Sequence, residues 1–277
     1  MAFRSNIYKT SAELRLMVEP GLITAAALDA VRAAIVPGVT TLELDAIAER
    51  VIRDAGAEPN FMLVPGYRHT ICASVNEEVV HGIPGARVIQ PGDVVSIDCG
   101  AQLNGWNGDS AFTVVVPDAS RPEVVAERQR LADVTEQSLW AGIAALATVK
   151  RLNHVGAAIE EYIESQGDFG IIEDYTGHGI GRSMHEDPPV FNYRVREKGP
   201  EVKNGLAVAI EPMLTAGTID TVTLDDDWTV ATTDGTMAAH WEHSIAVHPG
   251  GIWVLTLADG GAAGLAQYGI TPVQIAG

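Results

Sequence analysis

Apolar residues recur every three or four positions in two early stretches of the chain. In residues 11–35 this spacing predicts an amphipathic helix. A second helix is predicted to begin at Thr40, because Thr40 and Glu43 have the spacing of a capping box, in which each side chain hydrogen-bonds the backbone amide of the other residue. The periodicity continues towards Gly56, where we expect this helix to end.

Apolar runs that follow these helices predict β-strands. The polar stretch GAQLNGWNGD separates two of the runs, so we expect it to connect them as the turn of a hairpin. The predicted strands cover residues 70–75, 94–99 and 110–116.

The second half of the chain repeats this order of elements. Pro122 suits the first turn of a helix, because the missing N–H of proline costs nothing there. The stretch after Pro122 keeps the helical spacing, and a further helix is predicted at residues 152–165. Strands are then predicted at residues 206–210, 228–232, 240–247 and 252–257.

Two helices followed by strands, occurring twice, predict an α+β fold with internal pseudo-symmetry. The segment that joins the halves, residues 117–122, is too short for an independent linker. We therefore expect one domain over residues 1–277, with lobes at about residues 10–117 and 122–257.

Composition narrows the class of protein. The chain has 277 residues, 47% of them hydrophobic, and a formal net charge of −18. An acidic protein repels phosphate backbones and anionic lipids, so we expect no direct binding to nucleic acid or to membranes. Two cysteines are too few for a disulfide framework. Since neither a signal peptide nor a long unbroken apolar run is evident, we expect a soluble, cytoplasmic protein.

Four acidic residues stand on, or at the ends of, strands that otherwise consist of core residues: Asp98, Asp109, Glu211 and Glu242. Carboxylates gathered in a core repel one another unless a cation neutralises them. His178, in the glycine-rich GHGIG, adds an imidazole where the backbone can come close to a ligand. Four carboxylates balance two divalent cations, so the sequence predicts a site for two metal ions.

The predicted ligand set is rich in oxygen. Carboxylates with one imidazole favour manganese, iron or cobalt over a structural zinc site, which prefers thiolates. Cys99 is the neighbour of Asp98 on a strand, so its side chain is expected on the opposite face. We expect two divalent ions of cobalt, manganese, iron or zinc.

Six short motifs occur in order along the chain: SVNEEVVHGIP, SIDCG, GWNGDSA, GHGIGRSMHEDP, AIEPML and WEHSIAV. Together they make the chain resemble the type I methionine aminopeptidases, in their short bacterial form, over about residues 10–257. The resemblance implies the pita-bread fold and removal of the N-terminal methionine from nascent proteins. It also implies a monomer whose partner is the N-terminal peptide of a nascent protein, and which can act at the ribosome.

The resemblance further implies a role for each ligand. Asp109 and Glu242 would bridge two metal ions. Asp98 would bind one ion, close to the α-amino group of the substrate, whereas His178 and Glu211 would bind the other.

The catalytic residues are likewise implied by the resemblance. Two cations acidify a shared water, and Glu211 would be the proton shuttle for its attack on the first peptide bond. His185 would hydrogen-bond the developing oxyanion, and His81 would hydrogen-bond the scissile amide nitrogen. Both histidines would thus contact the substrate.

The expected substrate pocket departs from the family pattern. The stretch LVPGYRHTIC stands where a GYHGYP-like stretch is usual in the family. We still expect an apolar pocket that suits a flexible thioether, although leucine or norleucine could enter the same pocket. Its expected lining is Phe61, Tyr67, Cys72, Met184 and Trp228.

Three other functions compete with this prediction. A related aminopeptidase with a shifted side-chain preference would keep the metal ligands and change the pocket. An X-prolyl peptidase of the same fold usually has a large extra N-terminal domain, for which the residues before Thr10 leave no room. A non-catalytic binding protein of this fold typically loses metal ligands, and here the whole set is present.

Overall fold

The computed structural model describes residues 7–276. Residues 1–6 and residue 277 lie outside the described residues. The expectation of no signal peptide concerns the N-terminal segment, whose first six residues are among these. The elements of the first half are α1 (Ser11–Leu16), α2 (Val18–Ala34), α3 (Thr41–Asp54), β1 (Glu58–Pro59), the 3-10 turn η1 (Phe61–Leu63), β2 (Ile71–Val75), β3 (Glu78–Val80), β4 (Val94–Leu103) and β5 (Trp106–Val115).

The second half also begins with two helices and continues with strands, as the sequence predicted. Several of its strands have only two or three residues, too few to give a periodic signal, and were not predicted. Its elements are α4 (Pro122–Leu146), α5 (His154–Gln166), β6 (Gly170–Ile171), β7 (Gly177–Gly179), β8 (Glu186–Val190), β9 (Ala207–Ile210), β10 (Met213–Thr215), β11 (Thr221–Thr223), β12 (Val230–Thr232), β13 (Ala238–His240), β14 (His243–His248), β15 (Gly251–Val254), α6 (Ala262–Leu265) and the 3-10 turn η2 (Ala266–Tyr268).

The predicted start of α3 is confirmed. The Glu43 carboxylate accepts the Thr40 amide at 2.8 Å, and the Thr40 hydroxyl accepts the Glu43 amide at 3.2 Å. Both partners of the capping box are therefore formed, which satisfies amides that have no partner inside the helix. The helix ends at Asp54 with Ala55 as its C-cap, and Gly56 follows with a φ of 76°, a conformation that glycine adopts at little cost.

The single helix predicted over residues 11–35 is wrong, because α1 and α2 are separated at Met17. Pro20 explains the break. A proline has no N–H to donate to the carbonyl four residues earlier, and its ring clashes with that carbonyl, here that of Leu16. The chain therefore starts a new helix with Pro20 in its first turn, where no such bond is needed.

The hairpin predicted around residues 100–109 is confirmed, but its turn is much shorter than expected. Strands β4 and β5 stay paired up to Leu103 and Trp106, so that only Asn104 and Gly105 form the turn. Both have positive φ, 53° and 73°, as a two-residue hairpin turn requires. Asp109 consequently lies inside β5, with its side chain fixed by the pleat of the sheet.

The strand predicted over residues 240–247 proves to be two strands in different sheets. β13 pairs with β10, whereas β14 pairs with β9 and β15. Between them, Glu242 forms an isolated bridge to Ala111 of β5. The change of partner lets the chain of the second half touch the long hairpin of the first half at this residue.

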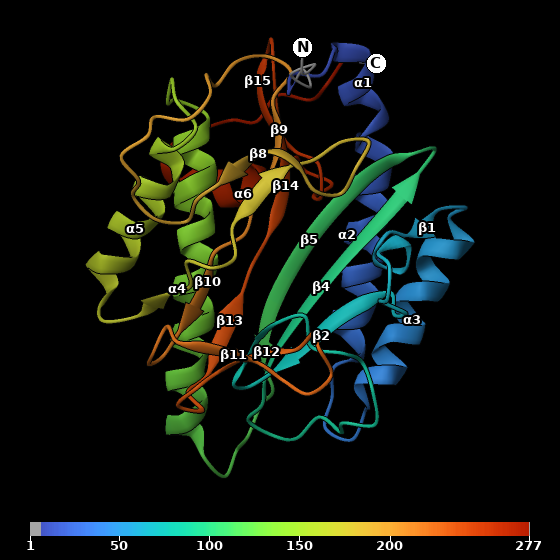
Figure 1. The fold of residues 1–277 in the computed structure, drawn as a ribbon, viewed down its shortest axis with the longest axis vertical. Helices are drawn as coiled ribbons and strands as arrows, with labels where there is room; N and C mark the ends of the chain where they lie inside the picture. The colour runs from blue at the N-terminus through green and yellow to red at the C-terminus, as the bar shows by residue number, and fades with distance from the viewer. Residues whose placement is uncertain (1–6, 277) are drawn as a thin grey trace.

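The sheets lie between two pairs of helices (Figure 1). Helices α2 and α3 lie outside the β4–β5 hairpin, and α4 and α5 lie on the opposite side of the molecule. One sheet has the order β1-β4-β2 with β5 on the free edge of β4, and another has the order β15-β14-β9-β7-β8. The three-stranded sheet β11-β12-β3 combines strands of both halves.

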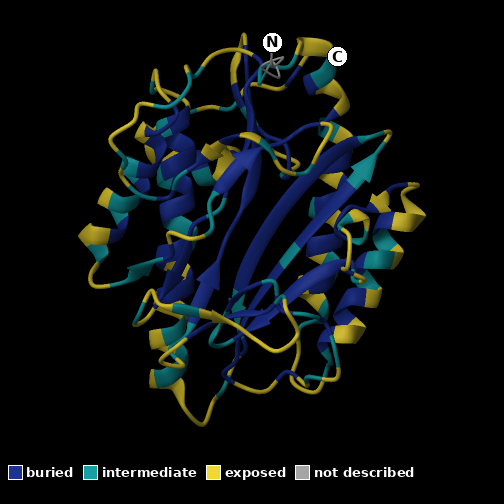
Figure 2. Cartoon of the chain, viewed as in Figure 1, coloured by how far each residue is buried: buried dark blue, intermediate teal, exposed yellow. Residues whose placement is uncertain are grey.

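Burial follows this arrangement. The strands between the helices are buried, whereas the outer faces of the helices and the loops are exposed (Figure 2). The largest buried apolar cluster takes side chains from both halves, such as Ile97 of β4 and Ile245 of β14. Among the described residues, no helix has the length and apolar character needed to cross a membrane.

We predict that Thr40→Ala lowers the free energy of unfolding by about 1 kcal/mol, the usual cost of removing a threonine N-cap. The reason is the loss of the acceptor for the Glu43 amide. Thr40→Ser keeps a hydroxyl at this position and serves as the control. Urea denaturation of the three proteins checks the effect, and equal stability of the alanine and serine variants would contradict it.

Candidate metal centre

Five strand regions bring the predicted ligands together. Asp98 lies on β4 and Asp109 on β5, Glu211 directly follows β9, and Glu242 stands between β13 and β14. His178 is the middle residue of β7. The five side chains come from distant parts of the sequence, and they meet because β5, β7, β9 and β14 converge at the centre of the molecule.

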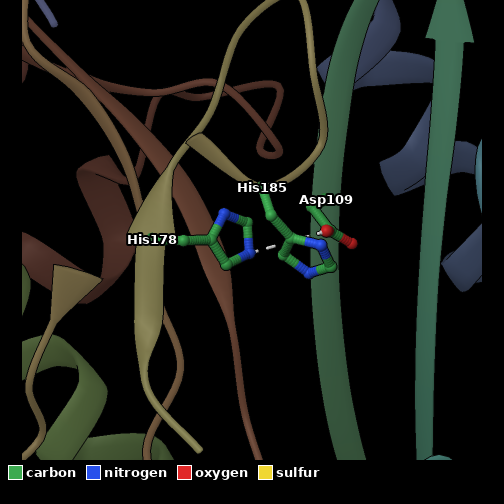
Figure 3. A group of neighbouring side chains, drawn as sticks. All are labelled: Asp109, His178 and His185. Carbon is green, nitrogen blue, oxygen red and sulfur yellow. Dashed lines mark ion pairs between the residues drawn. The ribbon is translucent and has the colours of Figure 1, made fainter. Parts of the chain in front are cut away.

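His178 is the hub of this cluster. Its Nε2 lies 3.5 Å from Glu211 Oε1, 3.9 Å from Asp109 Oδ2 and 4.0 Å from Glu242 Oε1. Figure 3 shows the imidazoles of His178 and His185 turned towards the Asp109 carboxylate, each from a different segment. Their ring centroids are 4.4 Å apart.

The hydrogen-bond partner of Nδ1 determines which nitrogen of His178 carries the hydrogen. Nδ1 lies 3.0 Å from the carbonyl oxygen of Gly179, which can only accept, so Nδ1 carries the hydrogen. Burial lowers the pKa of His178 to about 4, so the ring is neutral near pH 7. Nε2 therefore presents a lone pair to three carboxylates. A cation between these groups makes this arrangement favourable.

The carboxylates show the same need for positive charge. Burial raises the pKa of Asp98 to about 7. Burial, reinforced by repulsion between neighbouring carboxylates, raises the pKa of Asp109 and of Glu242 well above the ordinary values. One oxygen of each of these three side chains is buried without a hydrogen-bond partner among the described residues. Buried oxygens of this kind fit a divalent cation.

The possible ligand atoms form overlapping groups. One group contains Asp98, Asp109 and Glu242, and another contains His178, Glu211 and Glu242. Asp109 recurs in a third group with both His178 and His185. Within each group the atoms lie within 4.8 Å of one another. Asp109 and Glu242 thus lie between Asp98 on one side and His178 on the other.

Backbone contacts hold the two central carboxylates in register. The Glu242 amide donates to the Ala111 carbonyl at 3.0 Å, and the Ala111 amide donates to the Glu242 carbonyl at 3.2 Å. Ser244 Oγ donates to the Asp109 carbonyl at 2.7 Å, and Ser110 Oγ donates to the Glu242 carbonyl at 2.6 Å. The two halves of the molecule are therefore joined at the ligands themselves.

A cavity of about 230 Å³ opens onto this cluster. Every residue that the sequence analysis assigned to the site contributes to its wall, so the structure brings the predicted site together. The lining comprises Phe61, Val64, Tyr67, Cys72, Val80, His81, Asp98, Asp109, Tyr175, Thr176, His178, Met184, His185, Glu211, Met213, Trp228 and Glu242.

Residues 15–249 match metallopeptidase family M24. This chain belongs to that family. It is 49% identical to methionine aminopeptidase 1 of Mycobacterium tuberculosis, over 90% of this chain and 94% of that protein. It is 46% identical to methionine aminopeptidase 1 of Bacillus subtilis, over 90% of this chain and 98% of that protein.

The fold of this M24 metallopeptidase agrees with solved structures. The crystal structure of methionine aminopeptidase from Rickettsia prowazekii superposes with a TM-score of 0.83 and 34% identity, over 90% of this chain and 99% of the other. The predicted pita-bread fold and the predicted resemblance to methionine aminopeptidases are both confirmed. Membership of a metallopeptidase family, together with the acidic cluster, supports the use of divalent metal.

The far end of the cavity in this M24 chain is apolar. Tyr67 packs edge-on against Trp228, with centroids 5.0 Å apart, and against Phe61, with centroids 6.3 Å apart. Cys72 lies opposite Asp98 on the neighbouring strand and belongs to the same apolar cluster. Cys99 is fully buried in the main core, on the other face of β4, as the strand alternation predicted.

His81 has an unusual backbone conformation. Its φ of 61° is positive, and such strain in a residue other than glycine is concentrated at functional sites. Its ring packs edge-on against Tyr175, with centroids 5.4 Å apart at an angle of 88°. Burial lowers the pKa of His81 and of His185, so both rings are neutral near pH 7 and can act as hydrogen-bond donors.

Several residues around the cavity had no predicted role. The lining also includes Val80, Tyr175, Thr176 and Met213. These residues lie within or close to the motifs that carry the site residues, and this position in the sequence could have identified them. His240 is buried with Nε2 3.8 Å from Glu211 Oε2.

We predict that divalent metal stabilises this protein through the acidic cluster. Manganese or cobalt added to metal-stripped protein at one hundred times its Kd should raise the free energy of unfolding by about 2.7 kcal/mol for each ion bound. Asp109→Asn should lose most of this gain, because Asp109 is shared between the ligand groups.

Thermal unfolding by calorimetry, with and without metal, measures the gain. Glu49→Gln is the matched control, since Glu49 lies on α3 and pairs with Arg53. It should keep the whole metal-dependent shift. If metal stabilises the Asp109→Asn protein as much as the wild type, Asp109 is not a metal ligand.

Proposed function

We propose that this M24 metallopeptidase removes the N-terminal methionine from proteins by hydrolysing their first peptide bond. The observation that carries the proposal is one cavity in which an acidic cluster adjoins an apolar pocket. The cluster suits metal-assisted hydrolysis, and the pocket suits one apolar side chain. Relatives that are 46–49% identical are methionine aminopeptidases.

The residues that would hold metal are Asp98, Asp109, His178, Glu211 and Glu242. We assign two divalent ions, because Glu242 belongs to one group with Asp98 and Asp109 and to another with His178 and Glu211. The resemblance to methionine aminopeptidases implies that Asp109 and Glu242 would bridge the ions. When bound, such ions polarise the substrate carbonyl and make a water molecule more acidic. Cobalt, manganese, iron and zinc all accept such ligands, and availability decides among them.

Glu211 is proposed as the proton acceptor for the attacking water. Its side chain lines the cavity, and burial raises its pKa well above the ordinary value. In this environment Glu211 becomes an ionised base only when positive charge beside it offsets the cost of burial. The same carboxylate can return the proton to the leaving amine, since Glu211 faces the space that both would occupy.

His185 and His81 would hold the scissile peptide. Both rings are neutral near pH 7 and line the cavity. His185, beside His178, would donate a hydrogen bond to the oxyanion. His81 would hydrogen-bond the amide nitrogen, with Tyr175 packed against its ring. The free α-amino group would bind beside Asp98, which restricts the reaction to N-terminal residues.

The apolar end of the cavity would bind the methionine side chain. Phe61, Tyr67 and Cys72 form one buried apolar cluster there, and Met184 and Trp228 pack against it. Aromatic edges next to a thioether are favourable contacts, and a flexible side chain fits an irregular apolar pocket. A related aminopeptidase that prefers another apolar side chain is the alternative, because the same apolar wall could also accept leucine or norleucine.

The cellular setting stays a prediction. The expected substrate is the N-terminal peptide of a nascent protein, which gives access to a free amine. A monomer, a cytoplasmic location and action at the ribosome are consistent with this substrate. The net charge of −18 disfavours direct contact with nucleic acid.

We expect metal-stripped protein, reloaded anaerobically with manganese, iron or cobalt, to release the first residue of Met-Ala-Ser. Leu-Ala-Ser should react at least about tenfold more slowly, the usual scale for one misfitting apolar side chain. Ala-Pro-Ser should be inert. Release of leucine as fast as methionine would support metal-dependent peptide hydrolysis and contradict the preference for methionine. Absence of release from every peptide, with metal bound, would favour a binding protein.

Glu211→Gln should lower kcat by about a thousandfold, within the range that general bases contribute. Glutamine cannot accept the proton and is a weaker ligand. His185→Ala should lower kcat by about a hundredfold and leave metal content unchanged, because it removes one donor to the oxyanion. Steady-state kinetics with metal analysis separates the roles. Loss of metal from His185→Ala would move His185 into the ligand set.

A further inference from the structure

Helix α3 buries a carboxylate that takes no part in the metal cluster. Asp45 lies on the inner face of α3, in line with the buried Thr41, Ala48 and Ile52. Its side chain points towards the start of β2, and only 5% of the residue is exposed. A buried carboxylate is costly unless hydrogen bonds compensate it, so its partners indicate what it is for.

The partners of Asp45 all lie in one short segment, residues 64–71, which leads into β2. Oδ1 accepts the backbone amide of Thr70 at 2.8 Å and that of Ile71 at 3.0 Å. Oδ2 lies 3.3 Å from Nδ1 of His69. One side chain of α3 thus holds three consecutive residues at the point where the chain enters β2. Hydrogen bonds to a carboxylate are stronger than those between neutral groups.

This segment forms the wall of the proposed methionine pocket. Tyr67 lies in it, and the Tyr67 hydroxyl donates to the Ile71 carbonyl at 2.7 Å. The Tyr67 ring also packs edge-on against His69, with centroids 6.0 Å apart. Asp45 fixes the amide of Ile71 while Tyr67 binds its carbonyl, so the two contacts share one anchor residue.

The outer part of the segment contributes little support of its own. Pro65, Gly66 and Arg68 are exposed, and Gly66 has a φ of 95°. The inward position of Tyr67 therefore depends on its hydrogen bond, on Trp228 and Phe61, and on the residues that Asp45 holds. Removing the carboxylate leaves the buried amides of Thr70 and Ile71 without an acceptor, which favours a shift of the segment.

We propose that Asp45 is a positioning residue for side-chain selectivity: it fixes the segment of residues 64–71 and thereby the width of the apolar pocket. The proposal rests on the proposed function for its substrate. Asp45 does not line the cavity, so it acts on the substrate through Tyr67. It also stands outside the possible metal ligand groups, so the metal and the reaction should not depend on it.

The test compares Asp45→Ala with Asp45→Asn. Alanine removes both acceptor oxygens, whereas asparagine keeps one acceptor for the two amides and a polar atom towards His69. Thr40→Ala, at the N-cap of the same helix, is the control for general destabilisation, since the amide and hydroxyl of Thr40 bond with Glu43 and lie outside this anchor. Each protein is assayed for kcat and KM on Met-Ala-Ser and Leu-Ala-Ser, for metal content, and for amide hydrogen exchange.

We expect the ratio of kcat/KM for methionine over leucine to fall about tenfold in Asp45→Ala, chiefly through a higher KM for the methionine peptide. Asparagine should restore most of the ratio, and Thr40→Ala should leave it unchanged. The amides of Thr70 and Ile71 should exchange at least about tenfold faster in the alanine variant, because each loses a charged acceptor. An unchanged ratio with equal losses on both peptides would overturn the proposal.

Hydrogen exchange separates this proposal from the proposed function. If the wild-type protein cleaves neither peptide, the proposed function fails. The anchor is then tested by hydrogen exchange alone: the amides of Thr70 and Ile71 should exchange faster in Asp45→Ala than in the wild type, and equal rates would contradict the anchor. If Asp45→Ala does not fold, His69→Phe removes the Oδ2 contact and keeps an aromatic ring beside Tyr67. We expect a smaller fall in the methionine-to-leucine ratio for His69→Phe, and an unchanged ratio would count against the proposal.

Discussion

Mutual repulsion among buried carboxylates is the constraint on which this structure depends. Asp109 and Glu242 are almost fully buried, and they face a His178 nitrogen that offers a lone pair instead of a proton. Such a cluster is unfavourable without positive charge, because the low polarity of the interior strengthens repulsion. Bound divalent cations turn the same geometry into a favourable one, so the centre of the fold and its chemistry share one requirement.

The fold meets this requirement by joining its halves at the ligands. The bridge between Ala111 and Glu242, with the serine hydroxyls on either side, fixes the two central carboxylates in relation to each other. Strand alternation then separates chemistry from packing: Asp98 faces the cavity, whereas Cys99 faces the core. The outer helices cover the reverse faces of the sheets and leave the inner faces to the site (Figure 1).

Much of the site could be predicted from the sequence, because four acids on, or at the ends of, apolar strands form a joint signal that one acid alone does not give, and six motifs in order supplied the rest. The capping box at Thr40 was also predicted, since its partners are three residues apart. Features that depend on distant pairing were missed. The division of residues 240–247 into two strands follows from different partner strands, and the anchor between Asp45 and residues 69–71 joins segments that no local pattern connects.

The Asn104–Gly105 turn is a different kind of error. The dipeptide is a known hairpin signal, but the polar residues around it obscured strands that continue to Leu103 and from Trp106. A polar residue can belong to a strand, and is then no evidence of a loop, when its side chain faces a binding site. Asp109 shows this directly, because it was placed just before a strand and lies inside one.

Anomalous diffraction from crystals of manganese-loaded protein tests the central claim most directly. We expect two peaks inside the acidic cluster, with Asp109 and Glu242 as ligands common to both, Asp98 beside one peak and His178 beside the other. A single peak would contradict the assignment of two ions. The absence of any peak among these side chains would contradict the claim that bound metal offsets the repulsion at the centre of the fold.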